Sequence, residues 1–306
     1  MKRRNAVRQP RLKADVVQDK MISNQICRVC GGIIVKNGKR KDGVQTYKCT
    51  VCGRRCSDTN ESSLSSSKLS LDSISNLVTL IMIGSPDWAI AKIMHVNVKT
   101  AQFWRDRCID AANEWANACI LSGHVYMDEM FFSSARSGNG FKTVMTADDS
   151  HSRRVAMSIA FDSNGNGCCH VYMKSGTPSF KLVTKAFKNK IKRQSQFTHD
   201  HAYYYRQLKE KLELVDDPVK FDKNSAIYKS KMGLLNNCCS TIRYNFSCHR
   251  GIKLEKLQSY GNLFMYRWCT VRRLGFIDAV KDMFDRVCIA KKSHKFKDSF
   301  KKDSIW

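Results

Sequence analysis

The stretch VYMDEMFF, residues 125–132, places two carboxylates, Asp128 and Glu129, in the middle of a run of apolar and aromatic residues. Such a run is typical of a β-strand with a buried face. An unpaired carboxylate buried there costs several kcal/mol, or its pKa rises until the group is neutral. Something should therefore compensate Asp128, and a bound metal ion is one candidate. Glu129 points to the opposite face of such a strand, where a salt bridge to a Lys or Arg is expected.

Strand-like runs broken by turn residues follow this stretch along the chain. They cover residues 124–133, 142–149, 153–162 and 168–174. The pattern then predicts a helix over 177–192, a strand over 194–200 and a helix over 202–212, with helical character from Gly233 to Ala290. Strands first, and then strands alternating with helices, predict an α/β domain with a mixed sheet.

A second carboxylate, Asp200, ends the predicted strand QSQFTHD. If this strand lies beside the first, Asp200 and Asp128 meet at one edge of the core and repel each other. A divalent cation removes that penalty, and two hard oxygen ligands suit Mg²⁺ or Mn²⁺ rather than zinc. Asn236 or Asn237 is the nearest suitable third oxygen donor. Adjacent helical residues point about 100° apart, so only one of them can face the metals.

Other carboxylate pairs compete for this role. Asp148 and Asp149 end a predicted strand, and Asp216 and Asp217 precede a proline. Both pairs are interpreted as turn residues rather than ligands.

The charge balance of the chain is strongly basic, with 53 Lys and Arg against 27 Asp and Glu in 306 residues, for a net charge of +26. Such a field favours polyanions, with nucleic acid ahead of an acidic membrane. No apolar run reaches the length of a membrane span, and an apolar signal core is missing from the first residues, so a cytoplasmic location is expected. Residues 1–24 are interpreted as a basic flexible arm and residues 291–306 as a basic tail.

Four cysteines carry the strongest local signal. Two Cys-x-x-Cys knuckles predict a zinc ribbon over residues 25–58 with one structural Zn²⁺, bound by Cys27, Cys30, Cys49 and Cys52. Cys56 is expected to be an ordinary small residue. The other nine of the fourteen cysteines are interpreted as small buried apolar residues.

Three short helical patterns follow a Ser-rich linker. Ser70 can cap the first helix and Gly84 can end it. Ser85-Pro86 can start a second helix, which turns Trp88, Ile90 and Ile93 inward. Asn97 can cap the third helix. This arrangement predicts a helix-turn-helix-like DNA-binding domain over residues 69–118. A plain helical bundle is the alternative. The expected DNA contacts on the third helix are Lys99, Thr100, Gln102 and Arg105.

The chain resembles a family of bacterial insertion-sequence transposases that begin with a zinc ribbon and continue into an RNase H-like catalytic domain of the Asp-Asp-Asn type. The resemblance extends from Cys27 to about Tyr266. It rests on the cysteine ribbon, on MDE at 127–129, on Asp200 followed by Tyr203, and on LNNCCSTIRYNFSCHRGIKLEKLQSY at 235–260.

The resemblance implies an RNase H-like catalytic domain over residues 122–290, in which Asp128, Asp200 and Asn236 bind two Mg²⁺ or Mn²⁺ ions, with Asn237 as the fallback for the third ligand. It implies hydrolysis at the ends of a mobile element in double-stranded DNA, transfer of the freed 3′ end into target DNA, and a homo-oligomer that holds two ends in the bacterial nucleoid. A basic face on the late helical block is expected to contact phosphate through Arg243, Arg250 and Lys253.

Two other functions stay open. A non-catalytic regulator with a zinc ribbon and a helix-turn-helix would bind DNA without cutting it. An RNase H-like nuclease would cut nucleic acid without joining it.

Overall fold

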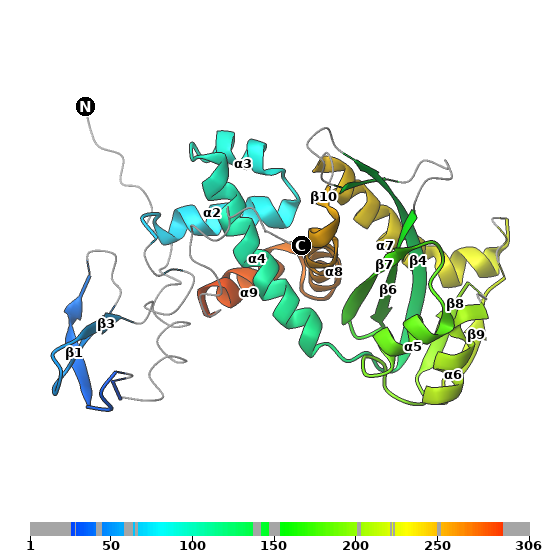
Figure 1. The fold of residues 1–306 in the computed structure, drawn as a ribbon, viewed down its shortest axis with the longest axis horizontal. Coiled ribbons are helices and arrows are strands. Elements are labelled where there is room, and N and C mark those ends of the chain that lie inside the picture. Colours follow the sequence, from blue (N-terminus) through cyan, green and yellow to red (C-terminus); the bar gives the residue numbers. More distant parts are fainter. Residues whose placement is uncertain are drawn as a thin grey trace.

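The computed structural model describes residues 26–27, 29–40, 45–57, 64, 67–136, 142–146, 154–200, 203–220, 222, 224–249 and 252–289 (Figure 1). The predicted basic arm and basic tail lie outside these residues, as do Asp148, Asp149 and Arg250. Among the described helices, none combines the length and apolar character that a membrane crossing needs.

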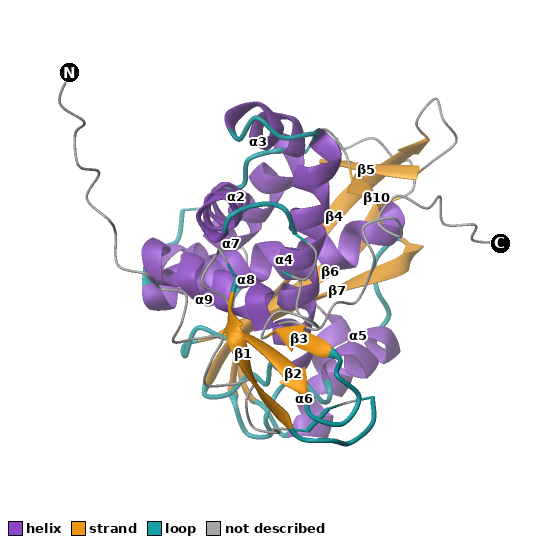
Figure 2. Cartoon of the chain, turned by 90° about the vertical axis from the view of Figure 1, so that its left-hand side faces the viewer, coloured by secondary structure: helices purple, strands orange, loops and turns teal. Residues whose placement is uncertain are grey.

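A small antiparallel sheet comes first, in the order β1-β2-β3. It consists of β1 (Ile34–Lys39), β2 (Gln45–Cys49) and β3 (Arg55–Ser57). Figure 2 views the molecule with this sheet toward the reader. The four predicted zinc ligands flank or end these strands: β1 and β2 lie between the two cysteine knuckles, and β3 follows the second knuckle.

Three helices follow where the sequence predicts them: α2 (Leu71–Ile83), α3 (Asp87–Ile93) and α4 (Val98–Ala118). The Ser70 side chain caps α2, Gly84 ends it with a φ of 99°, and the Asn97 side chain caps α4. Such a positive φ suits glycine, because it has no Cβ. The second helix differs from expectation, since it begins after Pro86 without a side-chain cap. Its seven residues have room for one buried stripe, so Trp88 and Ile93 stay about half exposed.

The helix α4 is the centre of a helical core. It packs against α2, α3, α8 (Leu257–Leu274) and α9 (Phe276–Ile289), and buried residues surround it on most sides. One continuous apolar cluster joins α2 and α4 to α8, α9 and the large sheet. The helix therefore serves as a packing element along its middle, and its exposed residues lie mainly in its first turn and toward its C-terminal end.

This burial corrects the prediction that Arg105 contacts DNA. The Arg105 side chain is fully buried; its Nε donates to Asp87 Oδ1 at 2.6 Å and its Nη2 donates to the carbonyl of Ser85. It fastens α4 to the α2–α3 connection from inside. Lys99 is exposed and Thr100 and Gln102 are partly exposed, so these three remain available as predicted contacts.

The large sheet is mixed, as predicted. Its strands are β4 (His124–Arg136), β5 (Lys142–Thr146), β6 (Arg154–Asp162), β7 (Gly167–Ser175), β8 (Gln196–His199), β9 (Val215–Pro218) and β10 (Ile252–Lys253). The main order is β10-β5-β4-β6-β7, and β8 pairs with both β4 and β9. The β4–β6 and β6–β7 pairs are antiparallel, whereas β4–β8 and β8–β9 are parallel. The central strand β4 thus has neighbours of both directions.

Helices cover both faces of this sheet (Figure 1). On one face, Met130 and Phe132 of β4 join the cluster formed by α4, α8 and α7 (Ala226–Cys248). On the other face, Val125 and Met127 pack with α5 (Phe180–Phe187) and α6 (Arg206–Leu212). Because side chains alternate along a strand, Asp128 lies on the α7 face and Glu129 on the α5–α6 face.

We expect Arg105→Ala to lower the free energy of unfolding by about 3 kcal/mol, because it leaves Asp87 without its partner and opens a gap in the helical core. Urea denaturation followed by circular dichroism measures this loss. The exposed Lys99→Ala is the matched control, with a change within about 0.5 kcal/mol. Equal stabilities of the two variants would contradict the structural role of Arg105.

Candidate functional site

Strand pairing brings Asp128 and Asp200 to matching positions. In the parallel β4–β8 pair, Val125 lies opposite Phe197 and Tyr126 opposite Thr198. Asp128 and Asp200 each come two residues after the Tyr126–Thr198 pair, so both carboxylates point to the same side of the sheet. Asp200 is the first residue beyond β8. The sequence analysis expected these two strands to be neighbours, and the sheet confirms this.

The environment of Asp128 disfavours its charged form. Burial raises its pKa, and the negative charge of Asp200 raises it further, to about 6. A backbone hydrogen bond from Glu129 N to Oδ1 at 2.8 Å, a contact with Cys239 and the positive charge of Arg243 offset only part of this shift. A divalent cation would stabilise two carboxylates that repel each other, and their oxygens are of the kind that Mg²⁺ or Mn²⁺ binds.

The helix α7 presents one face to this carboxylate pair. Cys239 Sγ donates to Asp128 Oδ2 at 3.8 Å, and Arg243, one turn further on, is exposed and close enough to lower the pKa of Asp128. The sequence analysis missed Cys239, which sits three residues after Asn236 and therefore on the same face of the helix. Helical spacing from a candidate ligand was the signal that could have found it.

The two candidate asparagines point in different directions. Asn237 Oδ1 accepts a hydrogen bond from Trp268 Nε1 at 3.2 Å, which directs this side chain toward α8. Asn236 is exposed, and its Nδ2 lies 3.5 Å from the hydroxyl of Tyr228 on its own helix. Asn236 therefore lies on the Cys239 face of α7 with its carbonyl oxygen Oδ1 on an accessible side chain.

Glu129 is buried on the opposite face, as expected, but its partners are hydroxyl groups instead of the predicted Lys or Arg. Ser158 Oγ donates to Oε1 at 2.5 Å, and Tyr205 OH donates to Oε2 at 2.6 Å. Burial raises the pKa of Glu129 to about 7, although the hydrogen bonds of Ser158, Tyr204 and Tyr205 counteract it. The packed α5–α6 face encloses this carboxyl group, so uncharged donors on neighbouring segments take the place of a long cationic side chain.

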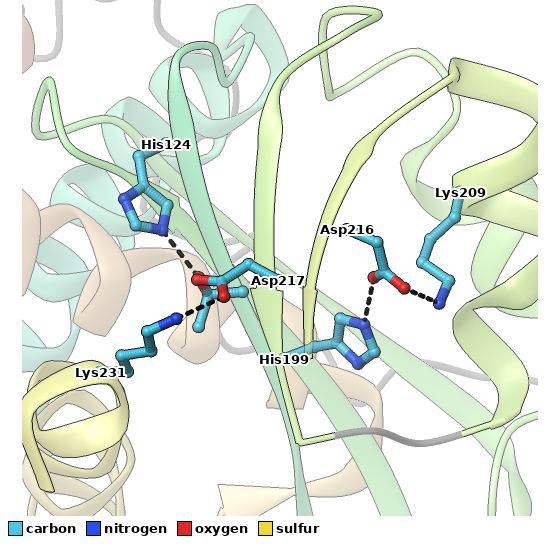
Figure 3. Close-up of polar contacts among 7 residues, drawn as sticks. His124, His199, Lys209, Asp216, Asp217 and Lys231 are labelled. Carbon is cyan, nitrogen blue, oxygen red and sulfur yellow. Dashed lines mark hydrogen bonds and ion pairs between the residues drawn. The ribbon is translucent and has the colours of Figure 1, made fainter. Parts of the chain in front are cut away.

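The competing carboxylates Asp216 and Asp217 lie in β9 rather than in a turn, which corrects the sequence interpretation. Figure 3 shows them pointing away from each other. Asp216 contacts His199 Nε2 at 2.9 Å and Lys209 Nζ at 2.6 Å. Asp217 contacts Lys231 Nζ at 2.5 Å and accepts from Thr198 Oγ1 at 2.9 Å. The hydrogen bond from Lys231 lowers the pKa of Asp217. Both groups are thus already paired, unlike a carboxylate reserved for a metal.

The late basic face is described in part. Arg243 and Lys253 are exposed, and Lys253 Nζ lies 3.7 Å from Glu255 Oε1. Both remain predicted phosphate contacts. Arg250 lies outside the described residues.

The four ribbon cysteines form a compact cluster. The Sγ atoms of Cys27, Cys30, Cys49 and Cys52 all lie within 4.8 Å of one another. The backbone N–H groups of Val51 and Cys52 approach Cys49 Sγ at 3.4 and 3.5 Å; hydrogen bonds of this kind lower the pKa of the Cys49 thiol to about 6. Four converging sulfurs and a thiolate-stabilising knuckle fit Zn²⁺, so the predicted ligand set is brought together.

Comparisons with known proteins give distant likenesses. No protein-family model matches the sequence, and no curated protein matches it. Among solved structures, the chain is similar to the Mos1 strand transfer complex, with 13% identity and a TM-score of 0.32 over 63% of this chain and 72% of that one. It is also similar to the mariner Mos1 paired end complex with Mg, with 10% identity and a TM-score of 0.33 over 65% and 74% of the two chains. Likeness this distant carries no functional inference for this chain.

We expect one Zn²⁺ per chain, bound through the four ribbon cysteines. Substitution with Co²⁺ should give the thiolate charge-transfer absorption of a tetrahedral four-sulfur site, and Cys49→Ser should abolish it. Cys56→Ser is the matched control, because Cys56 lies in β3 outside the cluster. Loss of zinc from the Cys56 variant, or its retention in the Cys49 variant, would refute this ligand set.

We expect Asp128→Asn to stabilise the fold in buffer without Mg²⁺ or Mn²⁺. The folded-state pKa of Asp128, about 6, lies above its ordinary value of 3.8. The ionised carboxylate therefore destabilises the native state progressively as pH rises from about 4, and fully above about 6. The gain from Asn should approach about 3 kcal/mol at pH 8 and vanish at pH 4.

Urea denaturation at the two pH values measures this gain. The exposed Glu210→Gln is the control and should show no comparable pH dependence. A variant as stable as the parent at pH 8 would show that Asp128 carries no such penalty.

Proposed function

We propose that this chain is a metal-dependent DNA transposase of the Asp-Asp-Asn type. The observation that supports the proposal is that Asp128 in β4, and Asp200 just beyond its parallel neighbour β8, each follow the last paired position by two residues, while Asp128 contacts Cys239 of the helix that bears Asn236. A sheet whose antiparallel strands come first and whose later strands alternate with helices supports the RNase H-like class.

The residues divide the work of phosphodiester chemistry. Asp128 and Asp200 supply carboxylate oxygens for two divalent cations, and Asn236 supplies a neutral amide oxygen. When bound, such cations activate an attacking oxygen and stabilise the leaving 3′ oxygen. Cys239 fills the space behind Asp128 and helps to exclude water. Arg243, exposed beside this pair, is placed to hold the scissile phosphate or its neighbour by charge.

The charge of the chain supports DNA as the partner. A net charge of +26 gives a long-range attraction for a polyanion. Lys99, Arg243 and Lys253 are exposed within the described residues and add local contacts. Joining two ends of an element needs both to be held together, so we infer a homo-oligomer on DNA that acts at the bacterial nucleoid.

The alternative of a non-catalytic regulator loses part of its basis. That function requires a helix that enters the major groove, and Arg105, one of the contacts expected on α4, is buried. The repulsion between Asp128 and Asp200 would also have no purpose in a regulator. An enzyme accounts for both observations.

We expect the purified chain to nick and join DNA that carries the sequences flanking its own gene, only with Mg²⁺ or Mn²⁺. Asp128→Asn and Asp200→Asn should each lower the rate at least about a hundredfold, because a lost charged ligand removes several kcal/mol of charge stabilisation. Asn236→Ala should lower it at least about tenfold, and Asn237→Ala should stay within about threefold.

Gel assays of plasmid nicking and strand joining measure these rates. Asp216→Asn is the matched control for a carboxylate paired within the fold, and it should retain the parent rate within about threefold. Parent activity in the Asp128 and Asp200 variants would disprove the assignment. Tight DNA binding without cation-dependent cleavage would favour the regulator.

A further inference from the structure

A buried cluster of hydroxyl groups surrounds Glu129 on the face of the sheet away from Asp128. We call it the Glu129 cluster; it consists of Glu129, Ser158, Tyr172, Tyr204 and Tyr205. Ser158 Oγ lies 2.5 Å from Glu129 Oε1 and 2.9 Å from Tyr172 OH, and Tyr205 OH lies 2.6 Å from Glu129 Oε2. The Tyr204 hydroxyl is close enough to Glu129 to lower the pKa of its carboxyl group. All five residues are buried.

The Glu129 cluster joins the two segments that bear the candidate metal ligands. Glu129 directly follows Asp128 and donates its backbone N–H to Asp128 Oδ1 at 2.8 Å. Tyr204 and Tyr205 belong to the short helix η1 (Tyr203–Tyr205), which begins three residues after Asp200. Tyr205 also packs edge-on against Phe197 and His199 of β8. One carboxylate therefore links β4 to the segment that leaves β8.

Such a link is needed where strand pairing stops. The β4–β8 pairing ends at Tyr126 and Thr198, two residues short of the carboxylates on each strand. Beyond that point the negative charge of Asp200 raises the pKa of Asp128, so the two carboxylates repel each other. The hydroxyl donors of η1 oppose this repulsion from the far side of the sheet. Ser158 sits directly across from Glu129 in the β4–β6 pair, which anchors the link in the sheet itself.

The same geometry excludes Glu129 as a metal ligand. Its side chain points to the face opposite Asp128 and both of its oxygens accept short hydrogen bonds from buried hydroxyls. Turning it toward the α7 face would break these bonds and reverse the alternation of β4. Glu129 can therefore affect the site only indirectly, by fixing the positions of β4 and η1.

We propose that Glu129 is a positioning residue, which through the hydroxyls of Tyr204 and Tyr205 sets the separation of Asp128 and Asp200 that metal binding requires. This inference rests on the proposed metal-dependent function. Its consequence is specific: breaking the link should weaken divalent-cation binding more than it weakens the fold, because a shift of about 1 Å between ligands is enough to impair a preorganised site.

The test compares two ways of removing buried hydroxyls from the Glu129 cluster. Tyr204→Phe/Tyr205→Phe deletes the donors attached to the Asp200 segment. Tyr172→Phe deletes the far end of the cluster on β7 and is the matched control. For each zinc-loaded protein, electron paramagnetic resonance measures Mn²⁺ binding, and the cleavage assay gives the Mg²⁺ concentration for half-maximal rate.

We expect the double variant to need about tenfold more Mn²⁺ and Mg²⁺ than the parent, as for loss of groups that orient metal ligands. Tyr172→Phe should stay within about twofold. Glu129→Gln should resemble the double variant, since its amide cannot accept from all the hydroxyls that donate to the carboxylate. Thermal unfolding confirms that each variant is folded at the assay temperature. If the double variant is unfolded there, the single variant Tyr205→Phe replaces it.

Three possible results distinguish the positioning role of Glu129 from the proposed metal-dependent function. If the parent shows Mn²⁺ binding that depends on Asp128, but the tyrosine variants and Tyr172→Phe bind alike, the positioning role is wrong and the metal site stands. If the parent shows no Asp128-dependent binding, the proposed function and this inference both fail. Weaker binding in the tyrosine variants alone supports both.

Discussion

Repulsion between two carboxylates on adjacent parallel strands is the constraint on which this structure depends. Backbone pairing of β4 with β8 ends two residues before Asp128 and Asp200, and just beyond it the two carboxylates lie close enough to repel each other. Burial and the neighbouring charge raise the pKa of Asp128 to about 6, and Arg243 offsets only part of that shift. The fold therefore stores an electrostatic penalty at this edge of its core. In the proposed function, a divalent cation would remove this penalty.

Elsewhere among the described residues, several charged side chains are paired with an opposite charge of the same chain. Asp128 differs from them. Arg105 is matched by Asp87, and Arg107 Nη1 lies 3.3 Å from Asp110 Oδ2. Asp217 on β9 is matched by Lys231 from α7. These pairs satisfy each charge with one contributed by the chain, as partly buried ion pairs must. Asp128 is instead accompanied by another acid, which is the reverse of what stabilises a fold.

Local sequence signals predicted where helices begin and end. Contacts between distant segments determined which side chains are buried, and the sequence alone did not show this. The helix caps Ser70, Gly84 and Asn97 act within one turn, so their residue types suffice to identify them. The burial of Arg105 depends on helices more than 150 residues further along the chain, and a basic residue on a helix has no mark that separates core from surface. The choice between Asn236 and Asn237 likewise depends on Trp268 of α8. Hydroxyl partners for Glu129 come from two separate segments, β6 and η1, that only the folded sheet brings together.

Asp128 and Glu129 are adjacent carboxylates in the same apolar run. The register of β4 determines which face of the sheet each one occupies. A slip of one residue would turn Glu129 toward α7 and place Asp128 among the tyrosine hydroxyls. Pairing with β6 runs without interruption from Val125 to Ser133 and resists such a slip. Ser158 and Glu129 lie opposite each other in the β4–β6 pair, so the hydrogen bond between their side chains further stabilises this register. Glu129, held by hydroxyl groups on one face, thus fixes Asp128 on the α7 face of the sheet.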